Sequence, residues 1–208
     1  MKTVVEFLRN KGTDRLCYVG ELARLDRVYG WSHQVIGPEV STKQARQIPD
    51  YWKPDGCIVN NDALPADLTK GIPTVYLHRD PKTLSGKVAL IRYDEHEIGD
   101  LAARELLQLR LEHYAVVPDF AQSYWSAERE AGFLAAMQVN LKGVSVFSPT
   151  GESRREIGMR TQAISGWLSS LPLPLGVFAV NDEIARDVVS AMASVRASRR
   201  VCSLERSS

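Results

Sequence analysis

Short apolar runs alternate along the chain with longer segments whose apolar residues recur at helical spacing. The runs that predict strands are residues 3–8, 32–36, 56–60, 74–77, 88–93, 113–117, 144–147 and 175–180. The segments that predict helices are residues 16–29, 41–48, 95–108, 126–137, 154–169 and 182–192, with a short turn or helix at 64–68. Such repeated units predict an α/β fold in which parallel sheets are flanked by helices. Binding sites in such sheets lie at the carboxyl ends of the strands.

The composition is that of an ordinary globular protein. The chain has 208 residues, 44% of them apolar and 25% charged, and a net charge of +1. This near-neutral charge argues against a protein whose main function is to bind nucleic acid. No apolar run approaches the roughly 20 residues of a transmembrane helix, and the N-terminal run is too short for a secretory signal. The cysteines, Cys17, Cys57 and Cys202, are few and form no Cys-x-x-Cys pair, so we expect a cytoplasmic protein with no membrane partner.

The motifs of several enzyme classes are absent from the sequence. The chain contains no Gly-x-Gly, no phosphate-binding Gly-x-x-x-x-Gly-Lys loop and no Gly-x-Ser-x-Gly elbow. Its histidines have no metal-ligand spacing with one another or with cysteine. We therefore expect no cofactor, no metal and no enzymatic activity, although a Ser/His/Asp arrangement would leave no mark in one sequence.

Polar side chains with sugar-binding chemistry follow the predicted strands. Asp94, Arg129 and Asn181 lie in three segments of this kind, and Trp125 precedes the arginine in the second. A carboxylate accepts hydroxyl protons, a guanidinium donates them from a fixed fork, and an amide does both. An indole covers the apolar face of a sugar, or fills a core. These four residues are the candidate ligand-binding site.

Each of these residues also has a purely structural interpretation. Asp94 and Asp182 could cap the helices that follow them. Arg129 could form a surface ion pair with Glu128 or Glu130, which would contribute little. Their joint occurrence, each after a strand, favours binding.

The motifs resemble those of the effector-binding domain of the lactose/galactose-repressor family. The matching motifs are Asp94…Gly99…Ala102…Leu106, Arg129-x-x-Gly132-Phe133 and Phe178-Ala179-Val180-Asn181-Asp182…Ala185. Trp125-Ser126 and the segment 167–179 resemble the xylose-operon activator type in particular. The resemblance covers roughly residues 1–192.

This resemblance implies a two-lobed, type I periplasmic-binding-protein-like fold. The N-terminal lobe would span residues 1–91 and the C-terminal lobe residues 92–192. By the same resemblance Asp94, Arg129 and Asn181 would contact the hydroxyls of a sugar, and the domain would form a homodimer. Where the family often has Asn after the first Asp, this chain has Glu95.

The resemblance also implies parts that we do not expect in this chain. The family carries its DNA-binding helices before or after the sensor, and neither place shows them. Residues 193–208 are rich in Ser and Arg and lack a strand pattern, so we expect a disordered or frame-shifted tail. The C-terminal part of the fold would then be incomplete and a sheet edge open, which favours low stability or self-association.

The sequence thus predicts a sugar-sensing domain of a bacterial-type transcriptional regulator. DNA would be a partner only through a module absent from this chain. A pentose such as xylose follows from the resemblance alone. The alternatives are a stand-alone sugar-binding protein of transport type and a non-functional truncated remnant.

Overall fold

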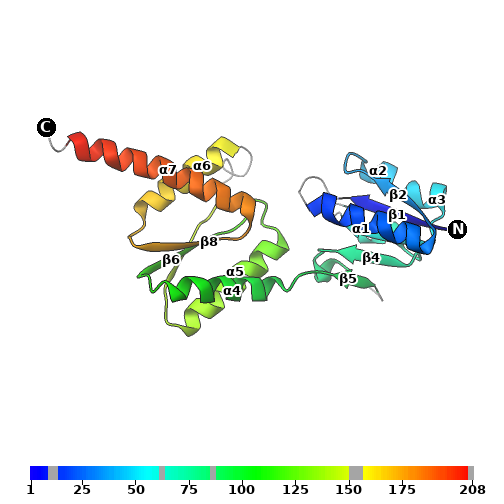
Figure 1. The fold of residues 1–208 in the computed structure, drawn as a ribbon, viewed down its shortest axis with the longest axis horizontal. Helices are drawn as coiled ribbons and strands as arrows, with labels where there is room; N and C mark the ends of the chain where they lie inside the picture. The colour runs from blue at the N-terminus through cyan, green and yellow to red at the C-terminus, as the bar shows by residue number, and fades with distance from the viewer. Residues whose placement is uncertain (9–13, 61–63, 85–87, 150–156, 206–208) are drawn as a thin grey trace. The chain divides into compact units, whose positions relative to one another are not determined.

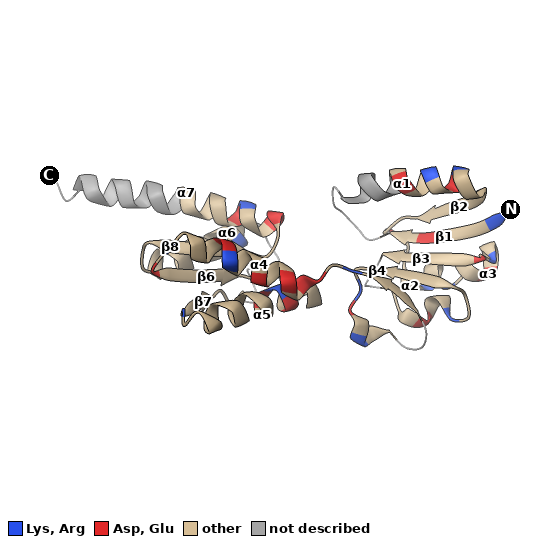
Figure 2. Ribbon diagram, turned by 60° about the horizontal axis from the view of Figure 1, so that its bottom comes forward, with Lys and Arg blue, Asp and Glu red and all other residues tan. Residues whose placement is uncertain are grey.

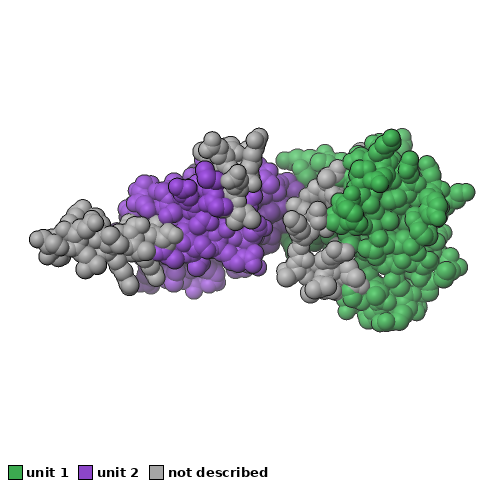
Figure 3. All heavy atoms as spheres, turned by 90° about the horizontal axis from the view of Figure 1, so that it is seen from above, with its two compact units in different colours: residues 1–93 green, residues 94–208 purple. Residues whose placement is uncertain are grey.

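The computed structural model describes residues 1–8, 14–60, 64–84, 88–149 and 157–205; the side chains of residues 14–19, 157 and 194–205 are outside this description. The chain divides into two compact units, Met1–Tyr93 (unit 1) and Asp94–Ser208 (unit 2), shown in Figure 3. The boundary predicted from the sequence lies at residues 91 and 92. Each unit contains its own parallel sheet and its own apolar core.

Unit 1 is built on a five-stranded sheet in the order β2-β1-β3-β4-β5, with every pair parallel. Its strands are β1 (Lys2–Leu8), β2 (Trp31–Ile36), β3 (Gly56–Asn60), β4 (Thr74–Leu77) and β5 (Ala89–Ile91). Its helices are α1 (Asp14–Tyr29), α2 (Thr42–Ala45) and α3 (Ile48–Trp52), with short 3-10 turns η1 (Ala66–Thr69) and η2 (Pro81–Thr83).

The two faces of β1 carry different chemistry, because successive side chains of a strand point to opposite faces. Val5 and Phe7 enter the apolar core with Cys57 of β3. Burial raises the pKa of the Cys57 thiol to about 11, so this thiol stays protonated and unreactive at neutral pH.

The opposite face of β1 carries a buried charge. Glu6, between Val5 and Phe7 in the chain, is fully buried and lies 3.2 Å from Nε2 of His33. Nδ1 of His33 lies 3.0 Å from a carboxylate oxygen of Asp26, so the imidazole joins two carboxylates.

Unit 2 has a three-stranded parallel sheet in the order β7-β6-β8. The strands are β6 (His113–Val117), β7 (Val144–Val146) and β8 (Leu175–Ala179), and the helices are α4 (Glu95–Gln108), α5 (Tyr124–Val139), α6 (Ile157–Ser170) and α7 (Asp182–Glu205). In Figure 1, α4 and α5 lie together on one side of this sheet and α6 and α7 on the other. The sheet is thus covered on both faces, as its continuous apolar strands require.

Two glycines let α4 and α5 cross with their backbones in contact. A Cβ atom at Gly99 would clash with the carbonyl oxygen of Arg129, and one at Gly132 would clash with the carbonyl oxygen of His96. Both clashes involve backbone atoms, which cannot rotate away. Glycine is therefore a steric requirement of this crossing, and the crossing fixes the start of α4 against the first half of α5.

The helix predicted over residues 41–48 is interrupted. Ser41 caps α2, as expected for a serine at a helix start: its hydroxyl accepts the N–H of Gln44, and the Gln44 side chain accepts the N–H of Ser41. Pro49 stands in the first turn of α3, where its missing N–H is tolerated. A second short helix, α3, therefore begins at Ile48, where the pattern predicted the end of the first.

Helix α7 runs to Glu205, past Met192, where the apolar pattern predicted its end. The side chains beyond residue 193 lie outside the described part, so the proposal of a frame-shifted tail stays a prediction. Residues 154–156, predicted as the start of α6, are also outside it. Among the helices that the structure describes, none is long and apolar enough to cross a membrane.

Candidate functional site

Arg129 joins three elements of unit 2. From α5 its Nε donates a hydrogen bond of 2.7 Å to a carboxylate oxygen of Glu95, at the start of α4, and its Nη2 lies 2.7 Å from the same oxygen. Its Nη1 donates a hydrogen bond of 2.7 Å to the carbonyl oxygen of Val180, the residue after β8. The N–H of Val180 in turn donates to the carbonyl of Val117, the last residue of β6. Arg129 is therefore held at the carboxyl ends of β6 and β8.

The ion pair between Glu95 and Arg129 is removed from water. Glu95 is 2% exposed and the Arg129 side chain 17%. Burying two charges is costly unless each is well paired and hydrogen-bonded. Here the two charges neutralise each other, and the Val180 carbonyl takes a further N–H. The guanidinium carbon also lies 5.1 Å from the ring centre of Trp125, one turn earlier on α5, as in a cation–π contact.

Asp94 and Asn181 each cap a helix at this edge of the sheet. Oδ1 of Asp94 accepts the N–H of Glu97 at 3.1 Å, which confirms the capping role expected for Asp94. Oδ1 of Asn181 accepts the N–H of Ile184 at 2.8 Å. The expectation that Asp182 caps α7 is wrong, because Asp182 is already the first residue of the helix.

The structure places the other three predicted site residues near Arg129: Trp125 contacts the guanidinium, and Asp94 and Asn181 are each next in the chain to a residue that does. Asp94 precedes Glu95 and Asn181 follows Val180, and both of these neighbours contact the guanidinium. The expectation that Arg129 pairs with Glu128 or Glu130 is wrong, since its partner is 34 positions away. Sequence reasoning had noted Glu95 only as a departure from the family pattern. The first turn of α4 is acidic, as the red colour at its start shows (Figure 2). This acidic turn was the one sequence signal for Glu95, and it does not tell which residue Glu95 pairs with.

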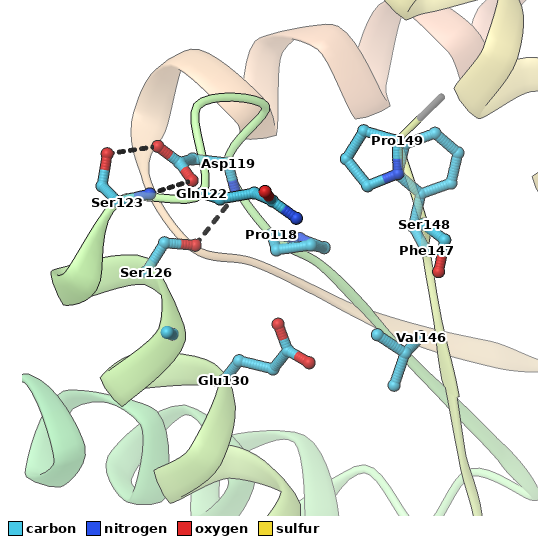
Figure 4. A pocket seen from close by; sticks show the side chains of 11 residues that line it. Pro118, Asp119, Gln122, Ser123, Ser126, Glu130, Val146, Phe147, Ser148 and Pro149 are labelled. Atoms are coloured by element: carbon cyan, nitrogen blue, oxygen red, sulfur yellow. Dashed lines mark hydrogen bonds between the residues drawn. The ribbon is translucent and has the colours of Figure 1, made fainter. Parts of the chain in front are cut away.

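A separate pocket lies at the carboxyl ends of β6 and β7 (Figure 4). Its volume is about 260 Å³, and it is lined by the loop 118–123, the first turns of α5 and residues 146–149. Oδ1 and Oδ2 of Asp119 accept the N–H and the hydroxyl of Ser123, at 3.0 and 2.7 Å. The N–H of Asp119 donates to the hydroxyl of Ser126 at 2.9 Å. These side chains hold the loop in shape.

Glu130 is a charged group of this pocket that takes no part in the hydrogen bonds of the loop. Its carboxylate points into the hollow in Figure 4, and no hydrogen bond or ion pair reaches it from the residues that the structure describes. Burial raises the pKa of Glu130 above its usual value. Sequence reasoning missed this pocket, although Pro118 and Asp119 follow a predicted strand. Across the described ranges, no three His, Cys, Asp or Glu side chains are grouped as a metal site would need.

Comparisons with known proteins identify the fold. No family model and no curated protein matches the sequence. The fructose-binding periplasmic domain of a hybrid two-component system matches with a TM-score of 0.72 at 22% identity, over 93% of this chain and 69% of that one. A dimeric Lac repressor with an 11-residue C-terminal deletion matches with a TM-score of 0.71 at 14% identity, over 92% and 72% of the two chains. The chain has the type I periplasmic-binding-protein-like fold.

The Cra transcriptional dual regulator of Pseudomonas putida, solved with fructose 1-phosphate, has the same periplasmic-binding-protein-like fold. It matches with a TM-score of 0.69 at 18% identity, over 92% of this chain and 73% of its own. The predicted fold class, α/β with parallel sheets flanked by helices, is thus confirmed. At these identities the likeness concerns the fold, and it extends over nearly all of this chain.

Proposed function

We propose that this chain is a sugar-sensing, effector-binding domain of a bacterial-type transcriptional regulator. The observation that carries the proposal is the set of contacts of Arg129 at the carboxyl edge of the sheet, with Trp125 and with the neighbours of Asp94 and Asn181 in the chain. The fold supports it, because matching structures include a fructose-binding domain and a regulator solved with fructose 1-phosphate. The xylose-type resemblance makes pentoses the first ligands to try.

The cluster leaves polar atoms for a ligand after its internal bonds are made. A guanidinium has five N–H groups, and each terminal nitrogen of Arg129 uses one of its two in the contacts described. Asp94 caps α4 with one oxygen and keeps the other. Asn181 caps α7 with its oxygen and keeps its amide N–H groups. The caps therefore fix the direction of both side chains while sparing the atoms that would bind hydroxyls.

Ligand binding would act by population shift. A sugar that prefers one conformation of the domain stabilises that conformation. A DNA-binding module joined to the domain would report the change, since coupling requires two sites and two states. In this proposal residues 1–91 and 92–192 are the two lobes, and residues 193–208, in which α7 continues to Glu205, form the tail. The domain acts in the cytoplasm as a homodimer without enzymatic activity.

The test is thermal melting of the full chain against pentoses and hexoses, with calorimetric titration of any sugar that stabilises it. A ligand at 100 times its Kd adds about 2.7 kcal/mol of stability. Asn181→Asp and Asp94→Asn both keep a capping oxygen, so they test binding without removing a cap. We expect each to weaken binding by about tenfold, the loss of roughly one hydrogen bond to a ligand.

Asp182→Asn is the matched control, because Asp182 is exposed and stands beside Asn181 without capping. It should bind as the parent does. A cooperative melt that no sugar shifts would contradict the sensor proposal. If Glu130→Gln abolishes binding and Asn181→Asp does not, the ligand occupies the pocket between α5 and β7 instead.

A sugar-binding protein of transport type is the second candidate function. The match to a fructose-binding periplasmic domain is the observation that favours it. Cell fractionation of the native protein separates the two: recovery outside the cytoplasmic membrane supports transport, and recovery in the cytoplasm supports the regulator.

A further inference from the structure

The charge balance around Arg129 bears on which ligands the cluster accepts. This inference rests on the proposed function, because it concerns the same site. We propose that Glu95 neutralises Arg129 and thereby makes the site select uncharged polyols over their phosphate esters. The juxtaposition that carries it is a buried carboxylate 2.7 Å from the guanidinium that a phosphate would otherwise pair with.

Arginine is the side chain best suited to bind phosphate, through two parallel N–H bonds. In this chain Nε and Nη2, the two nitrogens on one side of the fork, both face Glu95. Nη1 is directed to the Val180 carbonyl. A phosphate that pairs with Nε and Nη2 would have to displace Glu95, and one that approaches the remaining N–H groups would meet a guanidinium whose charge Glu95 already neutralises. The displaced carboxylate, now 2% exposed, would be a buried charge without its cation, which is strongly unfavourable.

The neighbouring helix starts do not offset this effect. The N-terminus of a helix attracts anions through its free N–H groups. At α4 the carboxylate of Asp94 already occupies that position, and Glu97 adds a second negative charge in the first turn. At α7 the Asn181 side chain takes the N–H of Ile184, and the first turn carries Asp182 and Glu183. The chain's own groups thus fill both anion-binding positions.

An uncharged hydroxyl meets no such obstacle. It can accept a remaining N–H from Nη1 or Nη2 of Arg129 while the ion pair stays intact. It can also donate to the free oxygen of Asp94. The site should therefore take a neutral sugar and reject the same sugar once it carries a phosphate.

Inorganic phosphate is the direct probe, because it needs no knowledge of the sugar. The full chain, Glu95→Gln and Glu105→Gln are titrated with phosphate at constant ionic strength, by calorimetry and by thermal melting. Glutamine keeps the shape of Glu95 and a hydrogen-bond acceptor for Arg129, but removes the charge. Glu105 is an exposed carboxylate on the same helix and serves as the matched control.

We expect Glu95→Gln to bind phosphate at least roughly tenfold more tightly than the parent chain, as a charge-assisted pair replaces the lost one. Glu105→Gln should behave as the parent does. Arg129→Gln added to Glu95→Gln should abolish the gain. A folded Glu95→Gln variant that binds phosphate no more tightly than the parent chain would overturn the proposal.

A comparison within the parent chain covers the case in which Glu95→Gln does not fold. Any sugar that binds is compared with its phosphate ester, and the ester should bind at least roughly tenfold more weakly. An ester that binds as tightly as the sugar would overturn the selectivity. If no sugar binds but Glu95→Gln gains phosphate, the sensor proposal fails while the role of Glu95 stands.

Discussion

Unit 1 and unit 2 each bury a glutamate, and the two glutamates have different surroundings. Glu6 lies within β1 and meets the imidazole of His33, which also contacts Asp26. Glu95 lies at a helix start and meets the guanidinium of Arg129, which also contacts the Val180 carbonyl. Burial alone therefore does not mark a binding site. The difference is that the second pair stands at the carboxyl ends of parallel strands, where ligands of such sheets bind.

The two units also differ in how these groups are held. In unit 2 the helices that carry Glu95 and Arg129 touch through Gly99 and Gly132, so their positions are fixed by backbone contact. In unit 1 the His33 cluster is held by side chains on β1, β2 and α1. Substitutions in each arrangement, with the free energy of unfolding as the measurement, show how much each contributes to the stability of its unit.

The largest effect is expected from Gly132→Ala. The new methyl group would clash with the carbonyl oxygen of His96 and push α4 and α5 apart. We expect a loss of about 3 kcal/mol or more, the upper range for overpacking, measured by urea unfolding. Gly166→Ala is the control: a Cβ at this exposed helical glycine meets nothing within 4 Å, so alanine should stabilise the chain by about 0.5–1 kcal/mol. Equal effects at the two positions would refute the backbone contact.

Glu95→Ala should cost about 3–5 kcal/mol, because it leaves the Arg129 guanidinium buried without its anion. A double-mutant cycle with Arg129→Ala measures the coupling. The double variant should be more stable than the sum of the single losses implies, since it removes both charges. Additive losses would mean that the two side chains do not interact.

His33→Ala should have a smaller effect in unit 1, about 1–3 kcal/mol, the cost of removing one partner from buried polar groups. Ser32→Ala serves as its control, because Ser32 is half-buried on the same strand and its hydroxyl accepts, within the described part of the chain, a single hydrogen bond of 3.4 Å from Gln34. If chemical denaturation gives the two variants the same stability, the polar contacts of the His33 cluster contribute nothing beyond packing.

Ser41→Ala should lower stability by about 1 kcal/mol, because the capping box at the start of α2 loses its side-chain oxygen. Thr42→Ala, one residue later and exposed, removes a hydroxyl of similar chemistry without touching the cap. A thermal melt in which both changes are neutral would show that the first turn of α2 needs no cap.

The smallest effect is expected from Glu130→Gln, and it depends on pH. Because burial raises the folded-state pKa of Glu130, the folded state is favoured when this group is protonated and loses stability as the pH rises through that pKa. Glutamine should therefore stabilise the chain by roughly 0.5 kcal/mol at pH 7, and the gain should vanish below the ordinary value of 4.5. A gain of the same size at pH 4 and pH 7 would contradict burial as the cause.

Local signals predicted much of the fold. The helix of residues 95–108 and the strands of residues 56–60, 74–77 and 113–117 have the bounds that apolar spacing and the Asp94 cap gave. These elements depend on residues close together in the chain. The end of α2 at Ala45 was missed because the helical pattern of residues 41–48 continues past it.

Sequence reasoning named the residues of the candidate site but not the bonds between them and their neighbours. That Arg129 lies with Asn181 followed from the strands that precede them, because the carboxyl ends of parallel strands in one sheet share one edge. The strand before Asp94, β5, belongs to the other sheet, and Asp94 stands at this edge as the cap of α4. That Glu95 is the partner of Arg129 did not follow, because an ion pair across 34 positions has no sequence period. The expectation that Asp182 caps α7 failed for a related reason: Asn181 and Asp182 can both cap a helix, and only the backbone angles decide where the helix begins.

The contact between α4 and α5 also has a genetic consequence. Every single-base change of a glycine codon that replaces the amino acid introduces a residue with a Cβ atom. At Gly99 and Gly132 no missense mutation is therefore conservative, whatever its polarity. A survey of random variants should find that Gly99 and Gly132 tolerate no substitution, while the outer faces of the same two helices tolerate most substitutions. Such a pattern would trace the crossing in living cells without any structure determination.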